Sequence, residues 1–145
     1  MNFLHSEEEV KDGMDLALCC LDLKGRVPQY AGANNSLYYI RNEELNEIKP
    51  DKQPVGRKED RHPFIKHGVH VKTGDYFYIF SDGYADQIGG PKGKKFMYRP
   101  FKEILLANHT KSMGEQKIIL EEKLEQWKGD LDQVDDICII GLRIT

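Results

Sequence analysis

Residues 76–80 form an unbroken aromatic and aliphatic run, YFYIF, and the sequence SDG follows directly at residues 81–83. A strand with one face in water alternates apolar and polar side chains, whereas a run without alternation predicts a strand covered on both faces. Such a strand requires a layered fold, because other elements must pack on each side of it. A charged carboxylate is costly to bury unless a partner neutralises it, so the position of Asp82 at the end of a buried strand requires a chemical explanation.

The chain has 145 residues, which is about the length of one average domain. Its hydrophobic content of 39%, charged content of 31% and net charge of -3 give no electrostatic reason to expect nucleic acid or an anionic membrane as a partner. The sequence shows neither a charged n-region with an apolar h-region nor a run long enough to cross a bilayer, so we expect a cytoplasmic segment. The cysteines Cys19, Cys20 and Cys138 lie within apolar runs and are interpreted as core residues rather than zinc ligands or a disulfide.

The other apolar runs predict an antiparallel sheet. Turn sequences rich in glycine, asparagine and charged residues separate these runs, which is typical of hairpins and meanders. The charged stretch at residues 49–63 contains three prolines and is interpreted as a surface loop. The expected strands cover residues 14–21, 26–33, 37–41, 46–48, 64–71, 76–80 and 134–144.

Two helices are expected near the C-terminus. Residues 99–108 place apolar side chains on one side at helical spacing. Ser112 and Glu115 match a capping box, and the apolar stripe of the helix that follows ends before Gly129. The sequence therefore predicts an α+β fold, an α/β sandwich of mainly antiparallel sheet with two C-terminal helices.

Acidic residues flank two of the expected strands. Asp82 follows the YFYIF strand, whereas Asp135 and Asp136 come directly before the run ICIIGL. If these two strands are antiparallel neighbours, the end of one lies beside the start of the other, and the carboxylates gather at one edge of the sheet. Carboxylates packed together repel unless a cation neutralises them, and oxygen donors without thiolate or paired histidine favour Mg²⁺ or Mn²⁺.

Gly83 would permit a sharp departure from the strand and leave room for water or phosphate near such an ion. A purely structural role is equally open on spacing alone, because Asp–Gly is a common turn pair and Asp is common before a strand. The stretch GGPKGKK lacks the order of a phosphate-binding loop, and no serine elbow supports a nucleophilic triad. Lys92, Lys94 and Lys95 are most simply a solvated loop, although a basic loop beside a metal site could also steer a phosphorylated substrate.

Six motifs, in their order and spacing, resemble the C-terminal half of SpoIIE-type serine/threonine phosphatases of the PPM (PP2C-like) class. They are GMDLALCCLD, YAGANNSLYYIR, DKQPVG, GDYFYIFSDGYADQIGG, GKKF and QVDDICIIGLRI, within residues 13–145. The resemblance implies a partial αββα sandwich in which aspartates at strand ends bind two Mn²⁺ or Mg²⁺ ions. It also implies that water activated by the metal attacks the phosphorus of a phosphoserine or phosphothreonine in a protein substrate.

The resemblance further implies roles for individual residues. Asp82 and Asp135 correspond to metal ligands of the family. Asp136 corresponds to a supporting residue or weaker ligand, and Asp86 occupies a position that is often acidic. Gly83 belongs to the same SDG motif.

The chain departs from the family pattern in two respects. Family members carry an upstream segment with a G-G-D aspartate and a D-x-x-G-H-G stretch, and this sequence contains neither. Ala33 stands where relatives often have a histidine after AG. We therefore expect residues 13–145 to be the C-terminal portion of a phosphatase domain and residues 1–12 to be an appended leading segment.

Two functions are consistent with these patterns. The first is a protein serine/threonine phosphatase domain that lacks its N-terminal metal-ligand segment, so that the isolated chain is expected to be inactive or incomplete. The second is an inactive, truncated relative that acts as a protein-binding or regulatory module for a sensor or an anti-sigma-antagonist-like partner. Strand faces that the absent half would cover should be apolar, so a homodimer is also expected.

Overall fold

The computed structural model describes residues 12–21, 27–56 and 62–145. The expectations for the leading segment, the turn after the first strand and part of the charged loop lie outside these described residues. The strands, in chain order, are β1 (Leu16–Cys20), β2 (Gln29–Ala33), β3 (Leu37–Arg41), β4 (Glu44–Ile48), β5 (His67–Gly68), β6 (Tyr76–Phe80), β7 (Ile88–Gly89), β8 (Lys94–Lys95) and β9 (Ile139–Arg143). The helices are α1 (Gly83–Asp86), α2 (Tyr98–Asn108) and α3 (Met113–Lys128).

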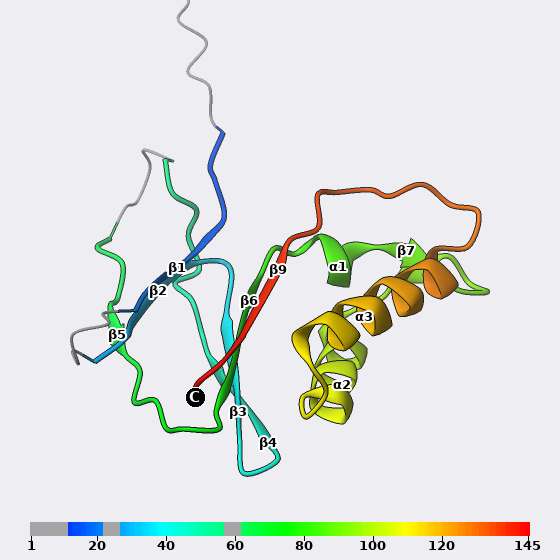
Figure 1. The fold of residues 1–145 in the computed structure, drawn as a ribbon. Coiled ribbons are helices and arrows are strands. Elements are labelled where there is room, and N and C mark those ends of the chain that lie inside the picture. Colours follow the sequence, from blue (N-terminus) through cyan, green and yellow to red (C-terminus); the bar gives the residue numbers. More distant parts are fainter. Residues whose placement is uncertain (1–11, 22–26, 57–61) are drawn as a thin grey trace, which may run out of the picture.

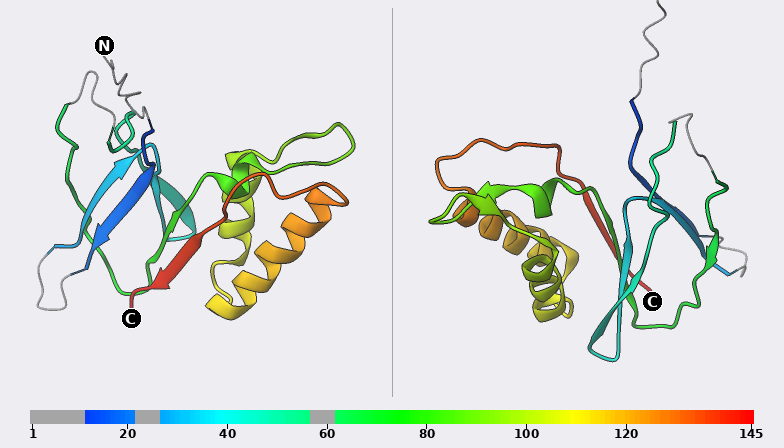
Figure 2. Two further views of the ribbon diagram at one scale, coloured as in Figure 1. Left: turned by 90° about the horizontal axis from the view of Figure 1, so that it is seen from above. Right: turned by 180° about the vertical axis from the view of Figure 1, so that it is seen from behind.

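The described strands form two main sheets that pack against each other through an apolar core, and the helices lie beyond the larger sheet (Figures 1 and 2). One sheet has the order β1-β2-β5 and the other the order β4-β3-β6-β9, and the strand pairs within both are antiparallel. Helices α2 and α3 cover the face of the larger sheet that points away from the smaller one. The expected α+β fold, with a mainly antiparallel sandwich and two C-terminal helices, is confirmed.

Strand β6 lies in the middle layer and contributes side chains to both cores. Tyr76, Tyr78 and Phe80 belong to the core under the helices. Phe77 is buried in the second core, between the two sheets, and Ile79 packs against it. The unbroken apolar run therefore does form a strand with apolar packing on both faces, as its lack of alternation predicts.

Both long helices begin and end close to where the sequence predicts. The Ser112 hydroxyl accepts from the Glu115 N–H while the Glu115 side chain accepts from the Ser112 N–H, so the capping box is present. Helix α3 ends before Gly129, whose φ of 56° lies in the region that glycine tolerates best. Phe101 and Leu105 are the buried residues of α2.

The outward face of β1 is uncovered in the described part of the chain. Leu16 and Leu18 point outward and are exposed. The interpretation of all three cysteines as core residues is wrong for Cys20 and Cys138, which are exposed. No layer formed by the described residues lies over that side of β1, and Cys138 lies just before β9. No helix among the described residues is long and apolar enough to span a bilayer.

Candidate functional site

The SDG and DD segments lie side by side at one edge of the larger sheet. Strands β6 and β9 are antiparallel neighbours, with Phe80 opposite Ile139, and the Ser81 N–H continues the ladder to the Cys138 carbonyl at 2.9 Å. The end of β6 is thus beside the start of β9, as the sequence predicts. Asp82 therefore lies near the loop that holds Asp135.

Ser81 joins these two segments through its side chain. Its hydroxyl donates to the Asp136 carbonyl at 2.9 Å and accepts from the Cys138 N–H at the same distance of 2.9 Å. Both bonds bind the turn after β6 to the backbone before β9. A serine at this position therefore fixes the spacing between the carboxylates that flank it in each segment.

Gly83 lets the two segments approach each other closely. A Cβ atom built on Gly83 would lie 2.3 Å from the Asp136 carbonyl oxygen and 2.9 Å from its carbon, which is far inside van der Waals contact. The space beside Gly83 is therefore filled by the backbone of Asp136 rather than left for a ligand. The glycine is needed for packing between the motifs.

The two consecutive aspartates differ in what their atoms do. The Asp135 carboxylate accepts from the Asp136 N–H at 2.7 Å, and the Asp135 carbonyl accepts from the Gln133 side chain at 2.8 Å. The carbonyl of Asp136 is bound by Ser81, and both aspartates are exposed. Asp135 is thus held by its local turn, whereas Asp136 contributes its backbone to the joint between the motifs.

Electrostatic repulsion is concentrated on Asp82. Burial raises the pKa of this carboxyl above its ordinary value, and the negative charges of Asp86, Asp135 and Asp15 raise it further. The neighbouring Tyr98 has its pKa raised to about 12, first by burial and then by some of the same carboxylates. A site that disfavours its own negative charge in this way is suited to a cation.

Asp15 is a member of this acidic neighbourhood that the sequence reasoning missed. It comes directly before β1, and its carboxylate accepts from the Asn34 side-chain amide at 2.8 Å. A cavity of about 170 Å³ is lined by Asp15 on one side and by Ser81 and Cys138 on the other. The signal was present in the GMD sequence, because Asp15, like Asp135 and Asp136, is an acid just before an apolar strand.

Asp86 is paired with a cation of this chain. It lies one turn after Asp82 in α1, where its N–H donates to the Asp82 carbonyl at 2.9 Å. The Lys95 ammonium lies 2.9 Å from the Asp86 carboxylate. Asp86 is therefore neutralised locally, whereas no hydrogen bond or ion pair to a cation is found at Asp82 or Asp135 within residues 62–145.

The donor chemistry fits a hard divalent cation bound at Asp82 and Asp135. Both supply carboxylate oxygens, and Mg²⁺ in particular often binds through one or two carboxylates while water or substrate phosphate completes its shell. Over the described ranges, however, no group of three histidine, cysteine or acidic side chains is arranged to hold a metal ion. The described residues thus fit one side of a metal site rather than a complete protein cage.

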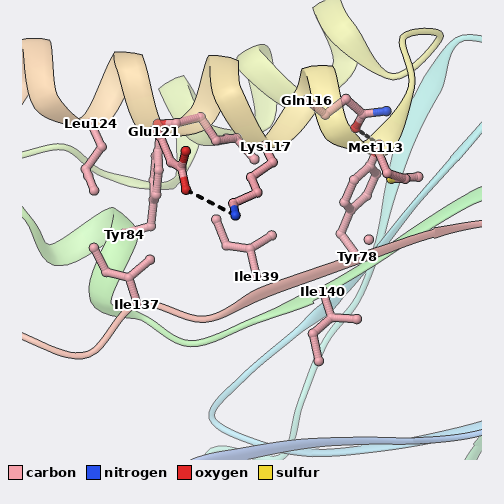
Figure 3. Close-up of a pocket in the computed structure, with 12 residues that line it drawn as sticks. Tyr78, Tyr84, Met113, Gln116, Lys117, Glu121, Leu124, Ile137, Ile139 and Ile140 are labelled. Atoms are coloured by element: carbon pink, nitrogen blue, oxygen red, sulfur yellow. Dashed lines mark hydrogen bonds and ion pairs between the residues drawn. The ribbon is translucent and has the colours of Figure 1, made fainter.

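A separate groove of about 480 Å³ lies between α3 and the start of β9 (Figure 3). Its walls are mostly apolar, with Met113 and Leu124 from α3 facing Ile139 from β9, and the Lys117–Glu121 pair at 3.7 Å lies beside them. None of the aspartates discussed above lines this groove. It is therefore distinct from the carboxylate site.

Comparisons with known proteins identify relatives of the chain by family model and by fold. The family model for stage II sporulation protein E (SpoIIE) matches residues 2–145. Among solved structures, the SiaA-PP2C domain of Pseudomonas aeruginosa has 30% sequence identity and a TM-score of 0.82, over 90% of this chain and 52% of that one. No curated protein sequence matches the chain.

More distant structures share the fold. The phosphatase domain of SpoIIE from Bacillus subtilis has 18% identity and a TM-score of 0.66, over 90% of this chain and 56% of that one. The PPM Ser-Thr phosphatase MsPP from Mycobacterium smegmatis has 14% identity and a TM-score of 0.62, over 98% of this chain and 67% of that one. The chain thus spans about half the length of the first two solved domains.

Proposed function

The chain belongs to the stage II sporulation protein E (SpoIIE) family, and from that premise we propose that it is part of a Mn²⁺- or Mg²⁺-dependent phosphoserine/phosphothreonine protein phosphatase domain. The observation that supports this most directly is the approach of Asp82 and Asp135 from neighbouring antiparallel strands. The raised pKa of Asp82 adds a reason for a cation between them. The PP2C-like fold supplies the family context.

In this proposal Asp82 and Asp135 bind the metal. When bound, such an ion acts as a Lewis acid that activates water toward phosphorus. The chain's own residues set the geometry: Ser81 and Gly83 hold the two motifs at a fixed separation, and the Asp136 backbone completes the joint. Asp86 supports the site through its pairing with Lys95 and through the turn that it shares with Asp82.

We further propose that residues 13–145 correspond to the C-terminal portion of the longer phosphatase domain, with residues 1–12 as an appended segment. The matched solved domains are about twice as long as the part that this chain covers. Additional metal ligands would come from the remainder of such a domain. The substrate would be a phosphoprotein in the cytoplasm, with a sensor or an anti-sigma-antagonist-like protein as the regulatory partner.

The alternative function is a regulatory or protein-binding module without catalysis. The lack of a three-residue metal group among the described residues favours this reading, as do the exposed Leu16 and Leu18 on the outward face of β1. A homodimer that covers this face is one form of that proposal. One matched structure is PppA, described as a key regulatory component of T6SS in Pseudomonas aeruginosa.

Phosphate release from a phosphoserine peptide with Mn²⁺ tests the enzyme proposal. Release by the wild-type chain that is lost in Asp82→Asn, which removes one charge and keeps the side-chain shape, would establish catalysis by this chain itself. A folded wild-type chain that binds Mn²⁺ in calorimetry but releases no phosphate would favour the regulatory module. Failure to bind Mn²⁺ as well would remove the metal proposal for this chain.

A further inference from the structure

We propose that Lys95 binds the phosphoryl group of the substrate, an inference that rests on the proposed phosphatase function. Lys95 is on the short hairpin formed by β7 and β8. Its ammonium contacts Asp86 at 2.9 Å, and Asp86 lies one helical turn from Asp82. A positive charge from this chain is thus placed beside Asp86, one turn from the carboxylate that would bind the metal.

The base of the hairpin is firmly attached to the end of α3. The Gly90 N–H donates to the Trp127 carbonyl at 2.8 Å, and the Trp127 indole donates to the Gln87 carbonyl at 3.0 Å. Gly89 lies so close that a Cβ there would be 1.9 Å from the Trp127 carbonyl oxygen. The backbone that carries Lys95 is therefore held in place.

Two further backbone bonds connect the residues directly after β8 to the C-terminal end of α1. The Phe96 N–H donates to the Gln87 carbonyl at 2.9 Å, and the Met97 N–H donates to the Ala85 carbonyl at 2.8 Å. The Lys95 side chain itself is 56% exposed. Because the backbone is anchored and the side chain is exposed, the ammonium can turn from Asp86 toward a ligand without a change in the fold.

The charge balance favours this role. The titratable neighbours that act on Asp82 are the acids Asp86, Asp135 and Asp15. A metal ion would neutralise part of this charge, but a phosphoryl dianion that approaches the remaining carboxylates still needs a cation. Lysine is a point charge that binds phosphate oxygens, and the pairing with Asp86 keeps it directed at the site before the substrate arrives.

A purely structural reading is that Lys95 only neutralises Asp86. The two readings differ in their dependence on the phosphoryl group. A structural lysine affects binding of any peptide at the site, or the stability of the fold, whereas a phosphate-binding lysine affects only a ligand with a phosphoryl group. A pair of peptides that differ only in that group separates the two readings.

The experiment measures fluorescence anisotropy of two labelled peptides with the full chain and Mn²⁺. One peptide contains serine and the other contains phosphonomethylalanine, a phosphoserine analogue that cannot be hydrolysed. The variants are Lys95→Met, Lys95→Arg and Lys92→Met, the last of which removes the same charge from the same hairpin. Inorganic phosphate serves as the competitor, so that binding of free phosphate and of the peptide can be compared.

We expect Lys95→Met to weaken binding of the phosphonate peptide about five- to tenfold, the loss of one charge-assisted hydrogen bond at a half-exposed site. Binding of the serine peptide should not change, Lys95→Arg should retain most of the affinity, and Lys92→Met should have an effect below about twofold. Lys95→Met should also bind inorganic phosphate more weakly, so that a higher phosphate concentration is needed for a given occupancy of the site than in wild type. This pattern would support the proposal.

Other outcomes overturn it in distinguishable ways. Equal effects of Lys95→Met on both peptides would assign Lys95 a structural role and leave the phosphatase proposal standing. An unchanged affinity of Lys95→Met for the phosphonate peptide would show that Lys95 does not bind the phosphoryl group, and would leave the phosphatase proposal untouched. A wild-type chain that does not distinguish the two peptides would contradict the proposed function at its first step, and the assignment of Lys95 with it.

Discussion

Replacing Gly83 by alanine should destabilise the protein and weaken metal binding together. The new Cβ would lie 2.3 Å from the Asp136 carbonyl oxygen, so the two motifs must separate by at least 0.7 Å to reach 3.0 Å, a distance that real Cβ atoms rarely fall below. The obstructing atom is backbone, and it is held by the Ser81 hydroxyl at 2.9 Å. The loop that contains Asp135 must therefore move away from Asp82.

The cost can be worked from this geometry. Overpacking a well-filled site typically costs about 1–3 kcal/mol, and a weakened hydrogen bond at Ser81 adds about 1 kcal/mol. The higher helix propensity of alanine in α1 opposes this by up to about 1 kcal/mol. We therefore expect the free energy of unfolding to fall by about 1–4 kcal/mol, which corresponds to a drop in Tm of about 2–16 °C for a domain of this size.

Urea unfolding of the Gly83→Ala chain measures this directly, and thermal unfolding with and without Mn²⁺ measures the metal response. Gly114→Ala is the matched control, because a Cβ there meets nothing within 4 Å and lies within α3, so stability should be unchanged or slightly higher. The reasoning is refuted if Gly83→Ala unfolds within about 0.5 kcal/mol of wild type, the range of an ordinary surface change.

Two further substitutions test the electrostatics. Because the pKa of Asp82 is raised in the fold, its ionised form destabilises the protein at neutral pH, so metal-free Asp82→Asn should be more stable than wild type. In urea unfolding this advantage should shrink as the pH falls below the raised pKa, and Mn²⁺ should raise the Tm of wild type only. Asp75 is buried and accepts hydrogen bonds from Arg41, which lower the pKa of its carboxyl. Asp75→Asn should therefore lower the free energy of unfolding by about 3–5 kcal/mol at neutral pH. This difference should disappear as the pH falls through the lowered pKa of Asp75; a difference that persisted in acid would contradict the assignment.

Local signals predicted the middle layer and the helices. The run at β6 lacks alternation, and this absence alone indicates cover on both faces. The capping box at Ser112 and the glycine after α3 define helix ends because both act through neighbouring backbone groups. The meeting of Asp82 with the DD motif followed from one topological assumption, that β6 and β9 are antiparallel neighbours.

Features that depend on distant contacts were missed or misread. Asp15 joins the site because β1 packs beside the end of β6. Its place before an apolar strand can be seen in the sequence, but its approach to Asp82 depends on that packing. The role of Gly83 depends on a backbone atom far along the chain, so the sequence suggested open space where the Asp136 carbonyl lies. The expected strand over residues 64–71 is reduced to the two residues of β5, which pair with Gln29 and Tyr30 of β2.

Trp127 is the chain's one tryptophan, and its surroundings give it a use in spectroscopy. The indole packs edge-on against Phe96 at a centroid distance of 5.4 Å and donates to the Gln87 carbonyl, both close to the β7–β8 hairpin. The intensity and wavelength of its emission therefore report the state of that hairpin specifically. Intrinsic fluorescence can follow a ligand-induced movement next to the carboxylates without any label, while changes confined to the β1 sheet should leave the emission unaltered.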